Sequence, residues 1–117
     1  MKQAELQMLI SPDMLDMEQG EPENPYNFSI LVQALIGIAS EEGADTFNII
    51  VCTPDWLKNR IPAEGYIIGR AHLIVARYDY GVIKKAIESW CEKAKGKDWN
   101  EIVNILAKYS QWEYESL

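Results

Sequence analysis

Two runs of alternating apolar residues, separated by only six polar or small residues, place the tightest constraint on how this 117-residue chain can fold. Residues 26–39 carry apolar side chains at nearly every second position, and residues 46–52 resume the alternation after the connection 40–45. A period of two is typical of β-strands with one buried face. A crossover between parallel strands needs about a dozen residues or more, so this link predicts an antiparallel pair.

Two further segments have strand character. Residues 2–10 alternate cleanly between apolar and polar side chains, which predicts a strand with one solvated face. Residues 72–78 predict another strand, with His72, Ile74, Ala76 and Tyr78 on one side. Residues 11–25, between the strand at 2–10 and the run at 26–39, contain three prolines and five acidic residues. This composition favours a loop.

A short helix is predicted between the last two strands. Thr53 followed by Pro54 is a typical helix start, because a hydroxyl can cap the helix and proline is tolerated at its first position. We expect this helix to cover residues 54–60 and to stop before Pro62. The aromatic tail, residues 111–115, is expected to form an edge strand or an extended arm on the domain.

Two longer helices are predicted near the end of the chain. Asp79 is a suitable cap for residues 80–95, in which apolar residues recur every three or four positions and which Gly96 is expected to end in a left-handed conformation. Asp98 and Glu101 have capping-box spacing and predict the start of a second helix.

Together these segments predict one α+β domain that spans residues 1–117. Its expected architecture is a mainly antiparallel sheet of about four to five strands, with two C-terminal helices packed on one face.

The residues that catalysis would need are sparse. The only histidine is His72, and neither Cys52 nor Cys91 belongs to a recognisable nucleophile or metal-binding motif. We therefore expect no enzyme activity, no cofactor and no bound metal, and we expect both cysteines to be reduced. An alternative remains open: a small ligand-binding domain or enzyme with a pocket between sheet and helices, using His72, Arg77 and Asp79.

Tryptophan and tyrosine are the other candidates for function, because they frequently anchor protein interfaces. Trp90 falls on the expected buried face of its helix, which favours a position in the core. Trp56, Trp99, Trp112 and Tyr114 are placed where they could be partly exposed, although a core position is favoured for each.

Charge is distributed unevenly along the chain. The net charge is −7, but residues 1–55 contain ten acids and one base, whereas residues 56–117 contain eight acids and ten bases. Such an acidic half repels nucleic acid and anionic membranes, and it attracts a basic protein. The candidate partner-binding residues lie in the predicted loop and hairpin connection: Asp13, Asp16, Glu18, Glu21, Glu23, Glu41 and Glu42. No apolar stretch is long enough for a secretory signal or a membrane span, so we expect a cytoplasmic protein.

Several segments resemble a known family. They are Ala4-Glu5-Leu6 with Ser11-Pro12-Asp13, Pro25-Tyr26-Asn27-Phe28, the run from Val51 to Leu57 (Val-Cys-Thr-Pro-Asp-Trp-Leu), the run from His72 to Tyr80, and Gln111-Trp112-Glu113-Tyr114. In this order they resemble immunity protein family eight, the antidotes of bacterial polymorphic-toxin and contact-dependent growth inhibition systems. The resemblance implies a non-enzymatic inhibitor that binds the C-terminal domain of a cognate toxin and covers its active site or an essential surface; nucleases are frequent among such toxins. It implies no particular binding residues.

Overall fold

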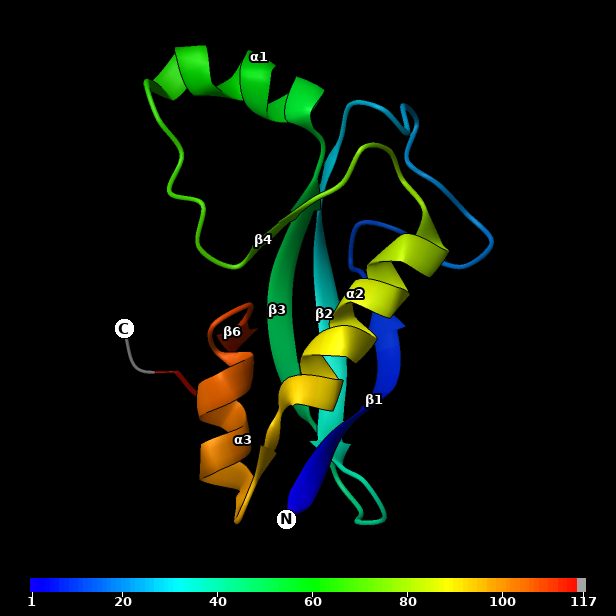
Figure 1. Cartoon of the computed structure of the whole chain (residues 1–117). Helices are drawn as coiled ribbons and strands as arrows, with labels where there is room; N and C mark the ends of the chain where they lie inside the picture. The colour runs from blue at the N-terminus through cyan, green and yellow to red at the C-terminus, as the bar shows by residue number, and fades with distance from the viewer. Residues whose placement is uncertain (116–117) are drawn as a thin grey trace.

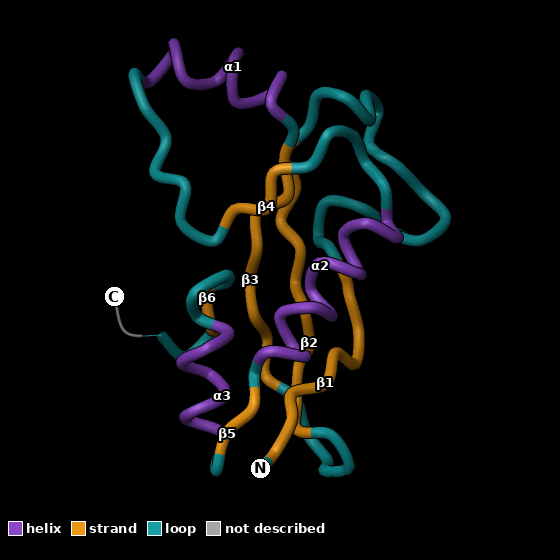
Figure 2. Tube along the Cα trace, in the orientation of Figure 1, coloured by secondary structure: helices purple, strands orange, loops and turns teal. Residues whose placement is uncertain are grey.

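The computed structural model describes residues 1–115 and combines one sheet with three helices (Figure 1). The elements in chain order are β1 (Lys2–Ile10), β2 (Ser29–Ile38), β3 (Asp45–Cys52), α1 (Pro54–Glu64), β4 (His72–Ile74), α2 (Tyr80–Lys93), β5 (Lys95–Gly96), α3 (Trp99–Leu106) and β6 (Gln111–Trp112). The α+β class is confirmed, and Figure 2 shows the long strands running side by side along the molecule.

The predicted antiparallel pair forms the centre of the sheet. β2 and β3 pair without interruption from Ser29 opposite Cys52 to Ile36 opposite Asp45. β1 lies antiparallel on the other side of β2, and its register shifts between Leu6 and Met8, so Gln7 is the extra residue of a β-bulge. The strand order is β4-β3-β2-β1-β5, with β6 also paired to β3.

The sheet is mixed. Its other strand pairs are antiparallel, as expected, and only the edge strand β4 departs from that expectation. β4 runs parallel to β3, because α1 and the residues after it form a connection long enough to return the chain to the same end of the sheet. β4 is also shorter than the predicted strand 72–78. The chain leaves the sheet after Val75, whose N–H donates to the carbonyl of Cys52, and the N–H of Tyr78 donates to the carbonyl of Pro25. The predicted strand is therefore confirmed only for residues 72–74.

The first helix differs from its prediction at both ends. The hydroxyl of Thr53 does not cap α1; it accepts a hydrogen bond from the backbone N–H of Phe28 at 3.2 Å. At the other end α1 continues past Pro62 to Glu64, and Gly65 ends it in a left-handed conformation with φ of 89°. None of the side chains of α1 is buried.

The later helices begin where the sequence places them. The carboxylate of Asp79 accepts from the N–H of Val82, and that of Asp98 accepts from the N–H of Glu101. The capping box is only half formed, because the Glu101 side chain accepts from the N–H of Lys97 rather than from that of Asp98.

The predicted end of α2 is wrong. The helix stops at Lys93, and the next residues pair with Lys2 and Gln3 of β1 as the short strand β5. Gly96 is not left-handed; glycine fits this position because a Cβ atom would lie 2.6 Å from the Cβ of Glu101. β5 and β6 thus follow helices, so strands and helices are less segregated than expected.

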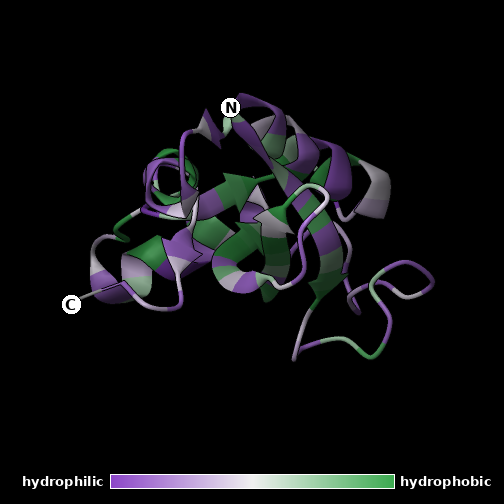
Figure 3. Cartoon of the chain, turned by 90° about the horizontal axis from the view of Figure 1, so that it is seen from below, coloured by the Kyte–Doolittle hydropathy of each residue, from purple (hydrophilic) through white to green (hydrophobic). Residues whose placement is uncertain are grey.

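One face of the sheet is buried beneath α2 and α3. The buried residues of β2 and β3 meet those of the two helices in a single apolar cluster, which includes Phe47, Ile49, Ile83, Ile87, Trp90, Ile102 and Leu106. Trp90 is confirmed as a core residue and stacks on Tyr109. Viewed along the strands, green apolar residues concentrate in the middle of the molecule and purple hydrophilic residues lie on the outer surfaces of the helices (Figure 3).

The buried hydroxyl of Thr53 gives a first prediction. Thr53→Val keeps the shape of the side chain but leaves the N–H of Phe28 without its acceptor, and this should lower the free energy of unfolding by about 1–3 kcal/mol. Urea denaturation followed by circular dichroism measures the change. Thr46→Val, at a half-buried site on β3, is the control and should change stability by less than about 0.5 kcal/mol. Equal effects would contradict the proposed role of the hydroxyl.

Candidate functional site

The acidic residues singled out from the sequence lie in two groups at opposite ends of β2. Residues 13–23 belong to the connection that precedes β2, and Glu41 and Glu42 belong to the turn that follows it (Figure 1). β2 has ten residues, which corresponds to a length of about 33 Å. The structure therefore does not bring the seven residues together, and a single partner would have to extend along the sheet to contact both groups.

Two carboxylates of the first group order their own loop. Asp13 accepts a hydrogen bond from the backbone N–H of Leu31 at 2.8 Å. Asp16 accepts from the N–H groups of Glu18 and Gln19 at 2.9 and 3.0 Å. Each carboxylate satisfies backbone donors beyond the end of β1, so both have a structural role whatever else they contact.

Two other acidic residues form exposed ion pairs. Glu41 lies 3.0 Å from the ammonium of Lys2, and Glu21 lies 3.8 Å from the guanidinium of Arg77, which also covers the ring of Tyr26. Exposed pairs of this kind contribute at most about 1 kcal/mol each. The side chains of Glu18, Glu23 and Glu42 are exposed to solvent.

The sheet face opposite α2 and α3 is a second candidate surface, which we call the open face. By strand register it comprises Met8, Ile10, Leu31, Gln33, Leu35, Asn48, Ile50, His72 and Ile74. Met8 is 54% exposed, Ile10 is 42% exposed and Ile74 is 55% exposed. The remaining members are partly exposed.

The open face has the composition of a protein-binding surface. None of these nine residues is Lys, Arg, Asp or Glu, although a quarter of the chain is charged. By the same register, exposed Glu5 lies opposite Gly37 on this side of the sheet, near the end of β2. The central part of protein interfaces is similarly depleted of charge. The alternation of residues 26–39 predicted one buried face for this strand and did not identify a binding surface on the other.

A close approach of two backbone segments brings the turn with Glu41 and Glu42 to one end of the open face. The Gly43 carbonyl lies so near Gly37 that a Cβ atom on Gly37 would be 2.2 Å from the Gly43 oxygen. The side-chain amide of Gln7 donates to the same carbonyl at 2.9 Å. Because Gly37 shares the outward side of β2 with Leu35, the turn that carries Glu41 and Glu42 folds over this end of the open face.

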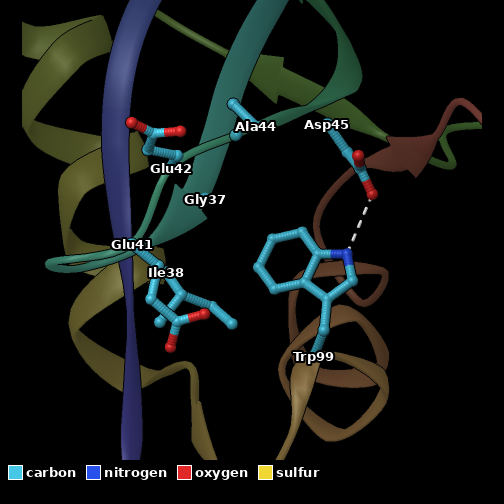
Figure 4. A pocket seen from close by; sticks show the side chains of 8 residues that line it. Gly37, Ile38, Glu41, Glu42, Ala44, Asp45 and Trp99 are labelled. Atoms are coloured by element: carbon cyan, nitrogen blue, oxygen red, sulfur yellow. Dashed lines mark hydrogen bonds between the residues drawn. The ribbon is translucent and has the colours of Figure 1, made fainter.

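Asp45 is a structural residue that the sequence analysis did not identify. Its Oδ2 atom accepts hydrogen bonds from the indole Nε1 of Trp99 at 2.8 Å and from that of Trp112 at 2.9 Å. One carboxylate thus links β3 to α3 and to β6. Trp99 and Asp45 also border a pocket of about 180 Å³ beside Glu41 and Glu42, and Figure 4 shows the Trp99 indole pointing to Asp45.

The residues of the alternative enzyme hypothesis serve separate local contacts. Nδ1 of His72 lies 2.7 Å from the carbonyl of Arg70, Arg77 contacts Tyr26, and Asp79 caps α2. Within residues 1–115, no hydrogen bond or ion pair joins the three side chains to one another.

The two cysteines are free and buried. Burial, followed by the negative charges of Glu88 and Glu92, raises the pKa of the Cys91 thiol to about 12, and burial raises the pKa of Cys52. Both thiols are therefore protonated at neutral pH, whereas a nucleophilic cysteine needs its pKa lowered.

Two features are absent from the described part of the chain: a metal-binding cluster and a helix able to span a membrane. In residues 1–115, no group of three or more His, Cys, Asp or Glu side chains is arranged to hold a metal ion. Of the three helices seen there, none combines the length and the apolar character needed to cross a lipid bilayer.

The indole contacts of Asp45 give a second prediction. Asp45→Ala should destabilise the fold by about 1–3 kcal/mol, because two indole N–H groups lose a charged acceptor. Tryptophan fluorescence should shift to longer wavelength as the β6 segment loosens. Glu42→Ala, an exposed neighbour in the same connection, should leave both stability and spectrum nearly unchanged. An unaltered spectrum in Asp45→Ala would show that the carboxylate does not hold the indoles.

The raised thiol pKa values give a third prediction. At pH 8 iodoacetamide should label the folded chain at least roughly 100-fold more slowly than the chain unfolded in urea, because the folded thiols are buried and protonated. Since folding raises the pKa of Cys91 from 9.0 to about 12, its contribution to stability should be lost as the pH rises across that interval. Mass spectrometry follows the labelling. Rapid labelling of the folded chain would contradict the prediction that its thiols are buried and protonated.

Comparison with known proteins agrees with the resemblance noted in the sequence. The family model for immunity protein 8 matches residues 4–117, nearly the whole chain. Neither the curated proteins nor the solved structures gave a match. The match covers every strand and helix described above except the first two residues of β1, Lys2 and Gln3. The chain therefore belongs to the immunity protein 8 family, whose members are immunity proteins that neutralise toxins.

Proposed function

We propose that this protein binds the C-terminal domain of a cognate bacterial toxin in the cytoplasm and covers its active site or an essential surface. Family membership is the observation that carries the proposal, since an immunity protein acts by neutralising a toxin. The inhibitor is not an enzyme: it acts by occupying the surface that the toxin needs.

The distribution of charge over the fold supports a basic partner. The first three strands and their connections, residues 1–53, contain nine acids and only one base, Lys2. Six of the eleven basic residues lie instead on or beside α2 and α3: Lys84, Lys85, Lys93, Lys95, Lys97 and Lys108. The same helical segment also carries five acids, Asp79, Glu88, Glu92, Asp98 and Glu101, so it is nearly neutral. The strand side is thus strongly acidic by comparison, and a cationic domain is attracted to it.

A nuclease domain is one class of toxin with such a surface, because it must bind the phosphate backbone with Lys and Arg. An acidic antidote competes for the same basic groove. We propose that Asp13, Asp16, Glu18, Glu21, Glu23, Glu41 and Glu42 steer this encounter. Steering raises the association rate, while the strength of the final complex depends on close contacts elsewhere.

The steering role can be tested by charge reversal. Glu41→Lys/Glu42→Lys should slow association about tenfold at low salt, and the difference should shrink as salt is added. The matched control, Glu88→Lys/Glu92→Lys on the exposed side of α2, produces the same change in net charge. Stopped-flow or surface plasmon resonance measures both rates. Equal slowing in the two variants would assign the effect to net charge alone, and unchanged association would exclude Glu41 and Glu42 from the encounter surface.

The proposed function itself is tested by capture and by protection. The tagged protein is used as bait in its native bacterium, and the retained proteins are identified by mass spectrometry. We expect the C-terminal domain of one large exported protein with nanomolar affinity, which corresponds to about −12 kcal/mol. That domain should stop growth when produced alone, and co-production of this protein should restore growth. A captured domain that is harmless, or that kills regardless of this protein, would refute the proposal.

A further inference from the structure

We propose that the open face is the surface on which the toxin domain docks, with its uncharged, partly apolar middle against an uncharged patch of the toxin and its acidic ends against basic residues. This inference rests on the proposed function and assigns it a location. It also differs from the sequence expectation, in which loop acids alone formed the binding site.

The open face is the large part of the sheet that the fold itself leaves uncovered. Within residues 1–115, α2 and α3 pack on the opposite face, and α1 buries none of its own side chains. The open face nevertheless holds apolar residues in adjacent positions: Met8 is opposite Leu35, and Leu31 is opposite Ile50. The amides of Gln33 and Asn48 lie between these two apolar pairs, so the middle of the face is uncharged and partly apolar. Depletion of charge is typical of the centre of an interaction site.

The surface is also rigid before any partner arrives. Its members lie on strands whose pairing is continuous over β2 and β3, and the side-chain amide of Gln33 donates to Asn48 across the pair at 3.4 Å. Preformed geometry lowers the entropic cost of binding. Tight binding is what an antidote requires.

The size of the open face suits a stable complex. β1, β2, β3 and β4 hold 9, 10, 8 and 3 residues, and at about 3.3 Å per residue and about 4.8 Å between strands they cover roughly 480 Å². The acidic turn that folds over one end enlarges the surface. A standard interface buries about 800 Å² on each partner, so the open face supplies more than half of that area and the acidic ends extend it.

Charge complementarity identifies the occupant as a basic domain rather than a second copy of this chain. Glu41 and Glu42 border one end of the open face, and the connection with Asp13 and Glu23 precedes β2 at the other. Two copies placed face to face would bring an acidic half of nine acids and one base against an identical half. Like charges disfavour that pairing, whereas a cationic toxin domain neutralises both ends.

Two exposed apolar residues provide a matched test. Met8 on the open face is 54% exposed, and Val82 on α2 is 52% exposed. Met8→Arg and Val82→Arg add the same charge at sites of equal exposure, so they alter the net charge and the stability by similar small amounts. The probe is the toxin domain captured by the wild-type protein, produced as a catalytically inactive variant. Biolayer interferometry measures association and dissociation, and light scattering measures the oligomeric state.

We expect Met8→Arg to weaken binding at least 100-fold, mainly through faster dissociation, and Val82→Arg to weaken it less than threefold. Ile10→Arg, 42% exposed on the same face, should reproduce the effect of Met8→Arg. Circular dichroism and thermal denaturation establish whether each variant is folded. If one open-face variant is not, the other still tests the surface.

The outcomes separate this inference from the proposed function. If the wild-type protein neutralises the toxin and both open-face variants bind it with unchanged affinity, the proposed docking surface is wrong and the proposed function stands. A wild-type protein that binds no toxin domain would refute the function itself. A wild-type dimer that Met8→Arg converts to a monomer would overturn the proposed occupant, because the open face would then join two copies of this chain.

Discussion

The antiparallel pairing of β2 with β3 is the interaction on which the remaining structure depends. Its eight paired positions, from Ser29 to Ile36, give the sheet a continuous buried face on which α2 and α3 pack. Each other strand adds to this pair: β1 joins β2, while β4 and β6 share the outer edge of β3. Because pleated strands direct alternate side chains to opposite faces, the same pairing that builds the core also presents Leu31, Leu35 and Ile50 on the open face.

Polar side chains at the ends of this pair connect the sheet to distant parts of the chain. At one end, Thr53 accepts from the N–H of Phe28, and Asp13 accepts from the N–H of Leu31 where β1 no longer pairs. At the other, Asp45 holds the indoles of Trp99 and Trp112. Buried backbone and indole donors are costly to leave without acceptors, so these few contacts determine where the loops, α3 and β6 lie.

In the proposed complex, the fold separates two contributions to partner recognition. Acidic side chains occupy the ends of the strands, whereas the open face between them is uncharged and in part apolar. Exposed charges act at long range and mainly raise the association rate, and apolar contacts that exclude water mainly slow dissociation. An antidote of the immunity protein 8 family benefits from both, since it must meet its toxin quickly and release it rarely. The helical side, with its lysines, stays available to solvent.

The sequence by itself determined the features that depend on neighbouring residues: the β2–β3 pair, the strand at residues 2–10, the caps at Asp79 and Asp98, the core position of Trp90, the acidic first half and the family. One error is local, because α1 continues past Pro62. The others concern contacts between distant segments. Thr53 was expected to cap α1 but bonds to Phe28, Gly96 was expected to end a helix but pairs with β1, and β4 proved parallel. The role of Asp45 and the separation of the acids along β2 had no local signal either. Helix caps and strand alternation are set by local backbone geometry, whereas hydrogen-bond partners and an uncovered sheet face exist only once segments far apart in sequence have packed together.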